Sequence, residues 1–145
     1  MIIDQLALLS DQQAVTASAA SANCLDLGAP GVVPYGSIQL KRKLGGAGCP
    51  IPLLIQVVQD FATLTSLTVT VQSDDNSSFS SPKDIISHTA GVADLKAGFI
   101  FPIDKLPVVK EQFVRLYFTV GGSNATAGKI TAGIVGAAEQ QSKNS

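Results

Sequence analysis

The most informative features of this 145-residue chain are the residue types that it lacks. It contains no tryptophan and one histidine, His88. A metal site like those of cupin barrels needs several imidazoles, and a Ser-His-Asp triad would have to use His88 as its base. No serine stands in a GxSxG sequence, and His88 falls at the predicted end of a strand. The sequence therefore predicts a protein that is not an enzyme and that holds no metal ion or cofactor.

Charged residues are also scarce, at 14% of the chain, against about 25% in typical globular domains. The net charge is −1, so global charge draws the chain toward neither nucleic acid nor an anionic membrane. Two interpretations of the low charge stay open. Part of the surface is covered by a protein partner, or the surface is simply rich in serine, threonine, asparagine and glutamine.

Cysteine usage and the apolar start of the chain both bear on the cellular compartment. Cys24 and Cys49 form no CxxC pair and have no metal-ligand spacing. They are interpreted as small thiols in a reducing compartment, although the sequence leaves a disulfide between them open. The start has no basic region and carries Asp4, so a signal peptide is not expected. The chain is expected to be made in a cytoplasm, or to be used in a particle assembled there.

Alternation of apolar and polar residues is the strongest pattern in the chain. It runs through the stretches 66–72, 114–120 and 130–134. Because successive strand side chains point to opposite faces, the apolar residues of each stretch are predicted to line one buried face. The stretch 99–103 alternates in the same way, but Pro102 within it indicates an edge position or an early strand end.

Further strand candidates complete an all-β pattern. The segment 53–58 is apolar almost throughout, which predicts a short strand buried on both faces. Weaker candidates are 14–18, 24–27, 38–40 and 85–88. Turn-rich sequences separate these segments, and a single helical turn is expected only around 92–96. The sequence predicts one domain, residues 1–145, folded as a jelly-roll-like antiparallel β-sandwich of about eight strands.

Two short sequences superficially resemble ligand-binding loops. The Asp-Asp-Asn stretch 74–76 lacks the alternating oxygen ligands, the glycine and the distal glutamate of an EF-hand loop. Turn capping by its side chains is predicted instead. The glycine-rich stretch 45–48 lacks the frame and the following helix of a phosphate-binding loop. Neither stretch changes the prediction of no cofactor.

Two segments are candidates for contact with other proteins. The N-terminal segment 1–12, which carries five large aliphatic side chains, is interpreted either as a first strand or helical turn packed on its own domain, or as an arm that docks on a neighbouring subunit. The only basic run, 41–43, is interpreted either as a solvated loop or as an electrostatic contact with an acidic protein surface. The polar residues 138–145 are expected to fray. The predicted contact residues are Ile2, Ile3, Leu6 and Leu9 near the start, and Lys41, Arg42 and Lys43 in the basic run.

Several strand-and-turn sequences, taken in order, are similar to those of a known protein family. They are 1–4, 10–21, 25–28, 67–75, 79–82, 115–120 and 126–133. Together they resemble the small capsid cement, or decoration, proteins of tailed bacteriophages over nearly the whole chain. No single motif is specific, so the resemblance depends on their joint occurrence. The segment 30–49 matches the family pattern least.

The resemblance implies a jelly-roll protein on the outer surface of an icosahedral phage head. Such a protein bridges neighbouring major capsid protein subunits and reinforces the shell against the pressure of the packaged DNA. The role leads us to expect a homo-oligomer, with a dimer favoured over a trimer, in the virion after synthesis in the host cytoplasm. The competing interpretation is a carbohydrate- or receptor-binding jelly roll of a tail or head fibre. For that function the chain offers few aromatic platforms, since it has no tryptophan and two tyrosines.

Overall fold

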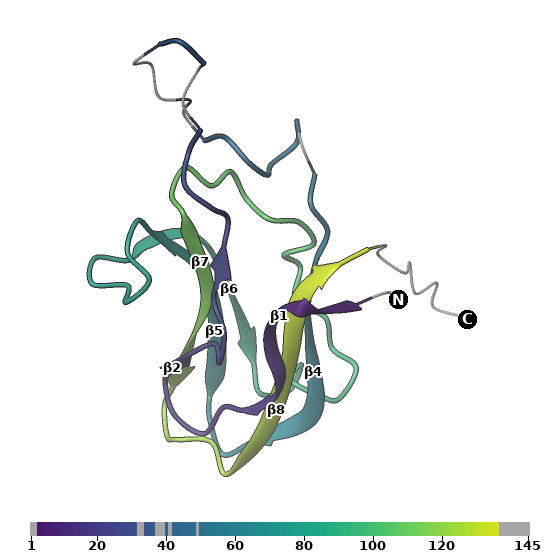
Figure 1. The fold of residues 1–145 in the computed structure, drawn as a ribbon. Coiled ribbons are helices and arrows are strands. Elements are labelled where there is room, and N and C mark those ends of the chain that lie inside the picture. The colour runs from purple at the N-terminus through teal and green to yellow at the C-terminus, as the bar shows by residue number, and fades with distance from the viewer. Residues whose placement is uncertain (1–2, 32–33, 37–39, 41, 49, 137–145) are drawn as a thin grey trace.

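The structure is a computed structural model, and two antiparallel sheets pack face to face in it (Figure 1). It describes residues 3–31, 34–36, 40, 42–48 and 50–136. Within these residues all the regular structure is strand, in eight elements β1 to β8, and helices are absent. The prediction of an all-β antiparallel sandwich of about eight strands is therefore confirmed.

The first sheet has three strands in the order β1-β8-β4. Their bounds are β1 (Ile3–Ala14), β4 (Leu53–Ala62) and β8 (Ala127–Val135). On the free side of β4, the chain at 100–105 adds two isolated bridges rather than a strand. The predicted strand at 99–103 is therefore wrong as a regular element, because Pro102 cannot donate a ladder hydrogen bond.

The second sheet has five strands, with β7 between β5 on one side and β2 and β3 on the other. Their bounds are β2 (Ala19–Ala20), β3 (Leu25–Asp26), β5 (Ser66–Asp74), β6 (Lys83–Gly91) and β7 (Phe113–Gly121). In both sheets a late strand, β7 or β8, lies between an early strand and a middle one. This nesting of distant segments is the connectivity of a jelly roll.

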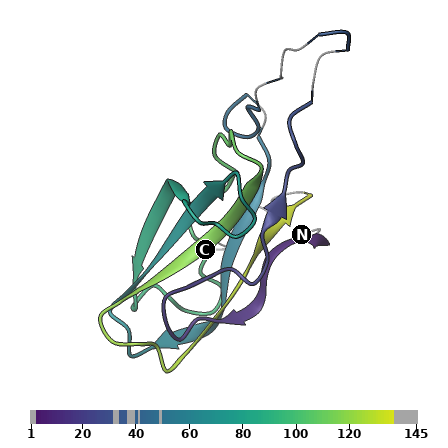
Figure 2. The same ribbon diagram turned by 60° about the vertical axis from the view of Figure 1, so that its left-hand side comes forward.

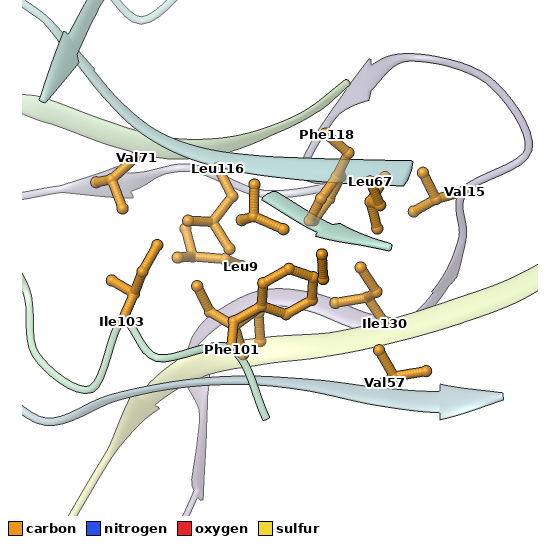
Figure 3. Packing of buried hydrophobic residues seen from close by; sticks show 14 of the residues in the cluster. Leu9, Val15, Val57, Leu67, Val71, Phe101, Ile103, Leu116, Phe118 and Ile130 are labelled. Atoms are coloured by element: carbon orange, nitrogen blue, oxygen red, sulfur yellow. The ribbon is translucent and has the colours of Figure 1, made fainter. Parts of the chain in front are cut away.

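The core lies between the sheets, and strand alternation decides which side chains enter it (Figure 3). The predicted inward residues of β5 are fully buried, and so are those of β7 apart from the half-buried Val120 and those of β8 apart from the half-buried Ile134. Phe101, from the bridging segment beside β4, fills the space between the two sheets in Figure 3. The inward set from these three strands is Leu67, Val69, Val71, Val114, Leu116, Phe118, Ile130 and Ala132.

β4 departs from its predicted burial. Its inward residues Leu53, Ile55 and Val57 are buried, but Leu54 is only half-buried and Val58 is exposed. The strand therefore has one buried face, not two. The reason is architectural, because the described residues place no further layer over the outer face of this sheet, and an apolar run alone does not reveal how many layers cover it.

Three other local predictions differ from the structure. The stretch 14–18 is a crossing between the two sheets rather than a strand, since β1 ends at Ala14 and β2 begins at Ala19. His88 lies in the middle of β6 instead of at a strand end, and its ring packs edge-on against Phe101 with the centroids 6.1 Å apart. The predicted turn near 92–96 is present as hydrogen-bonded turns without a helix.

Candidate interaction surface

β1 forms one edge of the first sheet, and its beginning bulges out of register with β8. Ile3 and Leu8 pair with residues only two apart on β8, so residues 4–7 stand opposite Ile134 alone. The Asp4 carboxylate accepts a hydrogen bond of 3.0 Å from the Leu6 backbone N–H and thereby closes the bulge. Leu6 is 90% exposed as a result.

The rest of β1 is irregular as well. Two further register shifts follow, and Gln12 has a φ of +43° with its N–H bonded to the Thr131 hydroxyl. On the outer edge of the strand, the Leu9 carbonyl accepts a hydrogen bond of 2.9 Å from the Asn23 N–H. Bulges and covering segments of this kind keep an edge strand from pairing with another chain. Contacts at this edge are therefore expected through side chains rather than through strand addition.

The predicted contact residues of the N-terminal segment have different surroundings. Ile3 and Leu6 are exposed, whereas Ile2 lies outside the described residues. Leu9 is 0% exposed and packs in the core (Figure 3), so the prediction that it contacts a partner is wrong. Pairing of β1 with β8 turns Leu9 to the inner face of the sheet. The described part of residues 1–12 is thus the first strand of the domain.

The long connection between β3 and β4, residues 27–52, projects from one end of the sandwich (Figures 1 and 2). Its first turn is held by Asp26, whose carboxylate accepts hydrogen bonds from the Gly28 N–H at 2.8 Å and from the Gln112 amide at 2.9 Å. The hydrogen bond from Gln112, the one from Gly28 and the charge of Arg42 lower the pKa of Asp26, against the effect of desolvation. The base of the connection is therefore tied to the end of β7.

Arg42 closes the base of this connection. Its Nη1 donates to the Leu27 carbonyl at 2.8 Å, and its Nη2 donates to the Gly28 carbonyl. The predicted role of Arg42 as an electrostatic contact with a partner is corrected accordingly, because the chain's own carbonyls take up its guanidinium. Lys43 is exposed, and Lys41 lies outside the described residues.

Residues 34–36, the short coloured stretch between two grey ones at the top of Figure 1, lie at the outer end of the connection. Their central residue is Tyr35. It is fully exposed and has a φ of +64°. An aromatic residue in the left-handed region is strained, and such strain persists only where the surrounding chain enforces it. Here Pro34 and Gly36 flank it in a turn. The turn presents the ring to solvent instead of packing it on the domain.

The connection between β5 and β6, residues 75–82, folds back over the second sheet instead. The Asp74 carboxylate accepts hydrogen bonds from the backbone N–H groups of Asn76 at 3.1 Å and Ser81 at 2.9 Å. These bonds confirm the predicted turn capping. Desolvation raises the pKa of Asp74, but the hydrogen bonds from Ser81, Asn76 and Asp75 together outweigh it and lower the pKa below its usual value.

Arg115 on β7 holds this second connection against the sheet. Its guanidinium carbon lies 4.2 Å from the centroid of the Phe79 ring and 5.6 Å from that of Tyr117. Its Nε donates to the Gln72 side chain at 2.9 Å, and Gln72 donates in turn to Asp84 at 2.7 Å. Phe79 is buried by this stacking, even though its φ is +50°.

A carboxylate bridge continues the polar network beside β6. Glu111 accepts hydrogen bonds from the Ser73 hydroxyl at 2.7 Å and from the Lys83 ammonium. Burial raises the pKa of Glu111. The hydrogen bonds from Lys83 and Ser73, together with the positive charge of Lys83, outweigh this effect and hold the pKa below its usual value. The hydrogen bond to Glu111 and the negative charge of Glu111 raise the pKa of Lys83 in turn.

The surface has several open hollows. Three of them have volumes of about 420, 460 and 330 Å³ and lie at the basic run, at the β1 bulge and beside Glu111. His88 lines none of these three. In the part of the chain that the structure describes, no group of three or more His, Cys, Asp or Glu side chains is placed to hold a metal ion. That part also contains no helix able to cross a membrane.

A protein-family model described as Bbp16 matches residues 9–134. The chain belongs to the Bbp16 family. The Bbp16 match contains the core strands, the loop with Tyr35 and the Arg115 cluster, whereas Ile3 and Leu6 precede it. No curated protein matches the chain.

Proposed function

We propose that this Bbp16-family protein is a capsid cement, or decoration, protein. It binds the outer surface of an icosahedral phage head and bridges neighbouring major capsid protein subunits. The observation that carries the proposal is that the two most exposed large apolar side chains of the described residues lie at two separate places on one sandwich. Leu6 lies on the β1 bulge, and Tyr35 lies at the tip of the β3–β4 connection.

Two separate contact points on one domain suit a protein that joins two subunits. Each exposed side chain that becomes buried at a seam contributes favourable free energy, on the order of 1–3 kcal/mol for a side chain the size of leucine. Such a protein binds the assembled shell and not the free subunit, so it stabilises the assembled state by mass action. Many copies on one shell multiply a modest effect per copy.

The low charge content and the resemblance of the sequence to cement proteins support the same function. A homodimer is the favoured assembly in this role and a trimer the alternative, since a shell presents symmetric sites. The proposed location is the outer capsid surface of the virion, after synthesis in the host cytoplasm.

Reconstitution on capsids tests the proposal. Capsids of the phage that encodes this chain are prepared without it, and the purified protein is added back. We expect the protein to co-sediment with the capsids in a fixed copy number and to raise the temperature at which they rupture. A double variant, Leu6→Ser with Tyr35→Ser, should bind weakly, while Val58→Ser on β4 serves as the matched control at another exposed apolar position. Equal rupture temperatures with and without the protein would exclude the function.

A second candidate is a carbohydrate- or receptor-binding module of a phage fibre. The observation that favours it is the exposed ring of Tyr35, because aromatic rings of this kind stack against sugars. A glycan array decides between the two. Saturable glycan binding that is lost in Tyr35→Ala, together with no binding to capsids, would favour the fibre module.

A further inference from the structure

The β3–β4 connection differs from the rest of the chain in charge. Residues 27–52, which form this connection, contain three basic residues and no acidic one. Since the whole chain has 10 basic and 11 acidic residues, the remainder has seven basic and eleven acidic ones. The segment therefore carries a charge of +3 and the remainder −4. A projecting positive loop on a negative body is steered toward an acidic partner surface.

Hydrogen bonds fix the base of this loop to the rest of the domain. Arg42 ties the returning chain to the carbonyls of Leu27 and Gly28. Beyond it, Leu44 and Val109 exchange backbone hydrogen bonds of 3.2 and 2.7 Å. A loop whose base is held in place before binding loses less conformational entropy when a partner is engaged.

The tip of the loop has the properties of an anchor. The Tyr35 ring is fully exposed, and its backbone is held in the strained left-handed region. Tyrosine supplies a large amphipathic contact area with few rotatable bonds, and it is enriched among the residues that dominate binding energy. Backbone strain in a non-glycine residue also concentrates at sites that clamp a ligand.

We infer that Tyr35 inserts into an apolar pocket on an acidic face of the capsid shell subunit. Arg42 acts as the positioning residue that aims the loop, and the exposed Lys43 faces the acidic rim of the pocket. The inference rests on the proposed function, because it takes the shell subunit as the partner. It adds which element of this chain makes the dominant contact and which chemistry receives it.

Two substitutions at Tyr35 separate the ring from the backbone. Tyr35→Phe keeps the ring, and Tyr35→Asn removes it while supplying a residue that tolerates the left-handed region. With empty capsids prepared without this protein as the probe, we expect Tyr35→Asn to weaken binding about tenfold or more and Tyr35→Phe by less than about threefold. Ile86→Thr, at another exposed apolar position on β6, is the control and should bind like the wild type.

The positioning role of Arg42 is tested by a double-mutant cycle. Arg42→Lys keeps the charge but loses the two-pronged hydrogen bond. It should weaken binding in the wild-type background and add little when Tyr35→Asn is already present, because its effect acts through the ring. Equal losses in both backgrounds would contradict the positioning role.

Salt titration tests the acidic rim. Wild-type binding to the capsids should weaken as ionic strength rises, and Lys43→Ser should reduce that dependence. A wild-type protein that does not bind the capsids would overturn both the proposed function and this inference. Wild-type binding that Tyr35→Asn leaves unchanged would overturn the inference alone.

Discussion

The β3–β4 and β5–β6 connections of this sandwich each contain an aromatic residue in the left-handed backbone region, yet the two rings have opposite surroundings. Phe79 has a φ of +50° and is buried under the guanidinium of Arg115. Tyr35 has a φ of +64° and is fully exposed. The two rings differ in where the nearest arginine lies. Arg115 stands on the sheet beneath Phe79, whereas Arg42 holds the base of the loop that carries Tyr35 away from the domain.

The comparison shows how one local conformation serves two purposes. A strained turn beside a sheet turns its ring inward, and the cation–π contact and burial offset the strain. The same turn at the end of a long connection has no surface of its own domain to cover. Its ring then remains available to another molecule. Substitutions in the two loops should therefore affect different measurements.

The largest expected effect is on stability, at Phe79. Phe79→Ala removes a buried ring and its contact with Arg115, and should lower the free energy of unfolding by about 3 kcal/mol. Tyr35→Ala removes an exposed ring and should change that free energy by less than about 0.5 kcal/mol. Urea denaturation of both variants measures the difference. Similar losses in the two would show that Tyr35 packs on the domain.

The two arginines provide the next comparison. Arg115→Lys loses the stacking on Phe79 and the hydrogen bond to Gln72, and should cost about 1–2 kcal/mol of unfolding free energy. Arg42→Lys should leave the unfolding free energy within about 0.5 kcal/mol of wild type, because it releases only a projecting loop. Denaturation of both variants in the same buffer checks this order, and the reverse order would contradict it.

Limited proteolysis should reveal the loops directly. Chymotrypsin is expected to cleave first after Tyr35 and to spare Phe79, since one ring is exposed and the other is buried. Arg42→Lys should accelerate the first cut several-fold by loosening the base of the loop. Mass spectrometry of the early fragments identifies the site. Initial cleavage after Phe79 would mean that the β5–β6 connection is the looser one.

The smallest expected effect is a difference in acid sensitivity. Hydrogen bonds hold the pKa values of Glu111 and Asp26 below their ordinary values of 4.5 and 3.8. A carboxyl whose pKa is lower in the folded state adds stability above its unfolded pKa, and this is lost as the pH falls through the folded pKa. Denaturation between pH 7 and 3 should show stability decreasing below about pH 4.5 in the wild type.

Two amide variants assign this acid sensitivity to one loop or the other. The decrease should be smaller in Glu111→Gln, because that carboxyl belongs to the network of the folded sheet. Asp26→Asn should instead change the acid dependence of cleavage at Tyr35, because Asp26 holds the base of the projecting loop. If Glu111→Gln and the wild type lose stability with pH in the same way, Glu111 does not contribute to the acid sensitivity of unfolding.

Much of the fold could be predicted because strand alternation is a local property of the chain. The inward faces of β5 and β7 follow directly from every second residue. The segment 53–58 was harder, because an apolar run does not say whether a second layer covers the outer side of its sheet. At 99–103 the alternation was correct for burial, since Phe101 and Ile103 are in the core, but a strand needs a partner ladder as well.

The candidate surface was less predictable because it depends on contacts between distant residues. The basic run pointed to Arg42 as a partner contact, but its partners are carbonyls about fifteen positions earlier in the chain. No local pattern distinguished Tyr35 from a buried tyrosine. Its sequence neighbours, a proline and a glycine, indicated a turn, and only the path of the connection showed that the turn lies beyond the sandwich.

By itself the sequence determined the all-β class and the inward residues of the regular strands, because side chains alternate wherever the backbone is extended. The tertiary structure decided which apolar residues near the start remain exposed. Leu6 and Leu9 belong to the same strand, but the bulge opposite β8 turns Leu6 into solvent and the regained pairing turns Leu9 into the core. Register between strands far apart in the chain is set by packing, and no local pattern contains it.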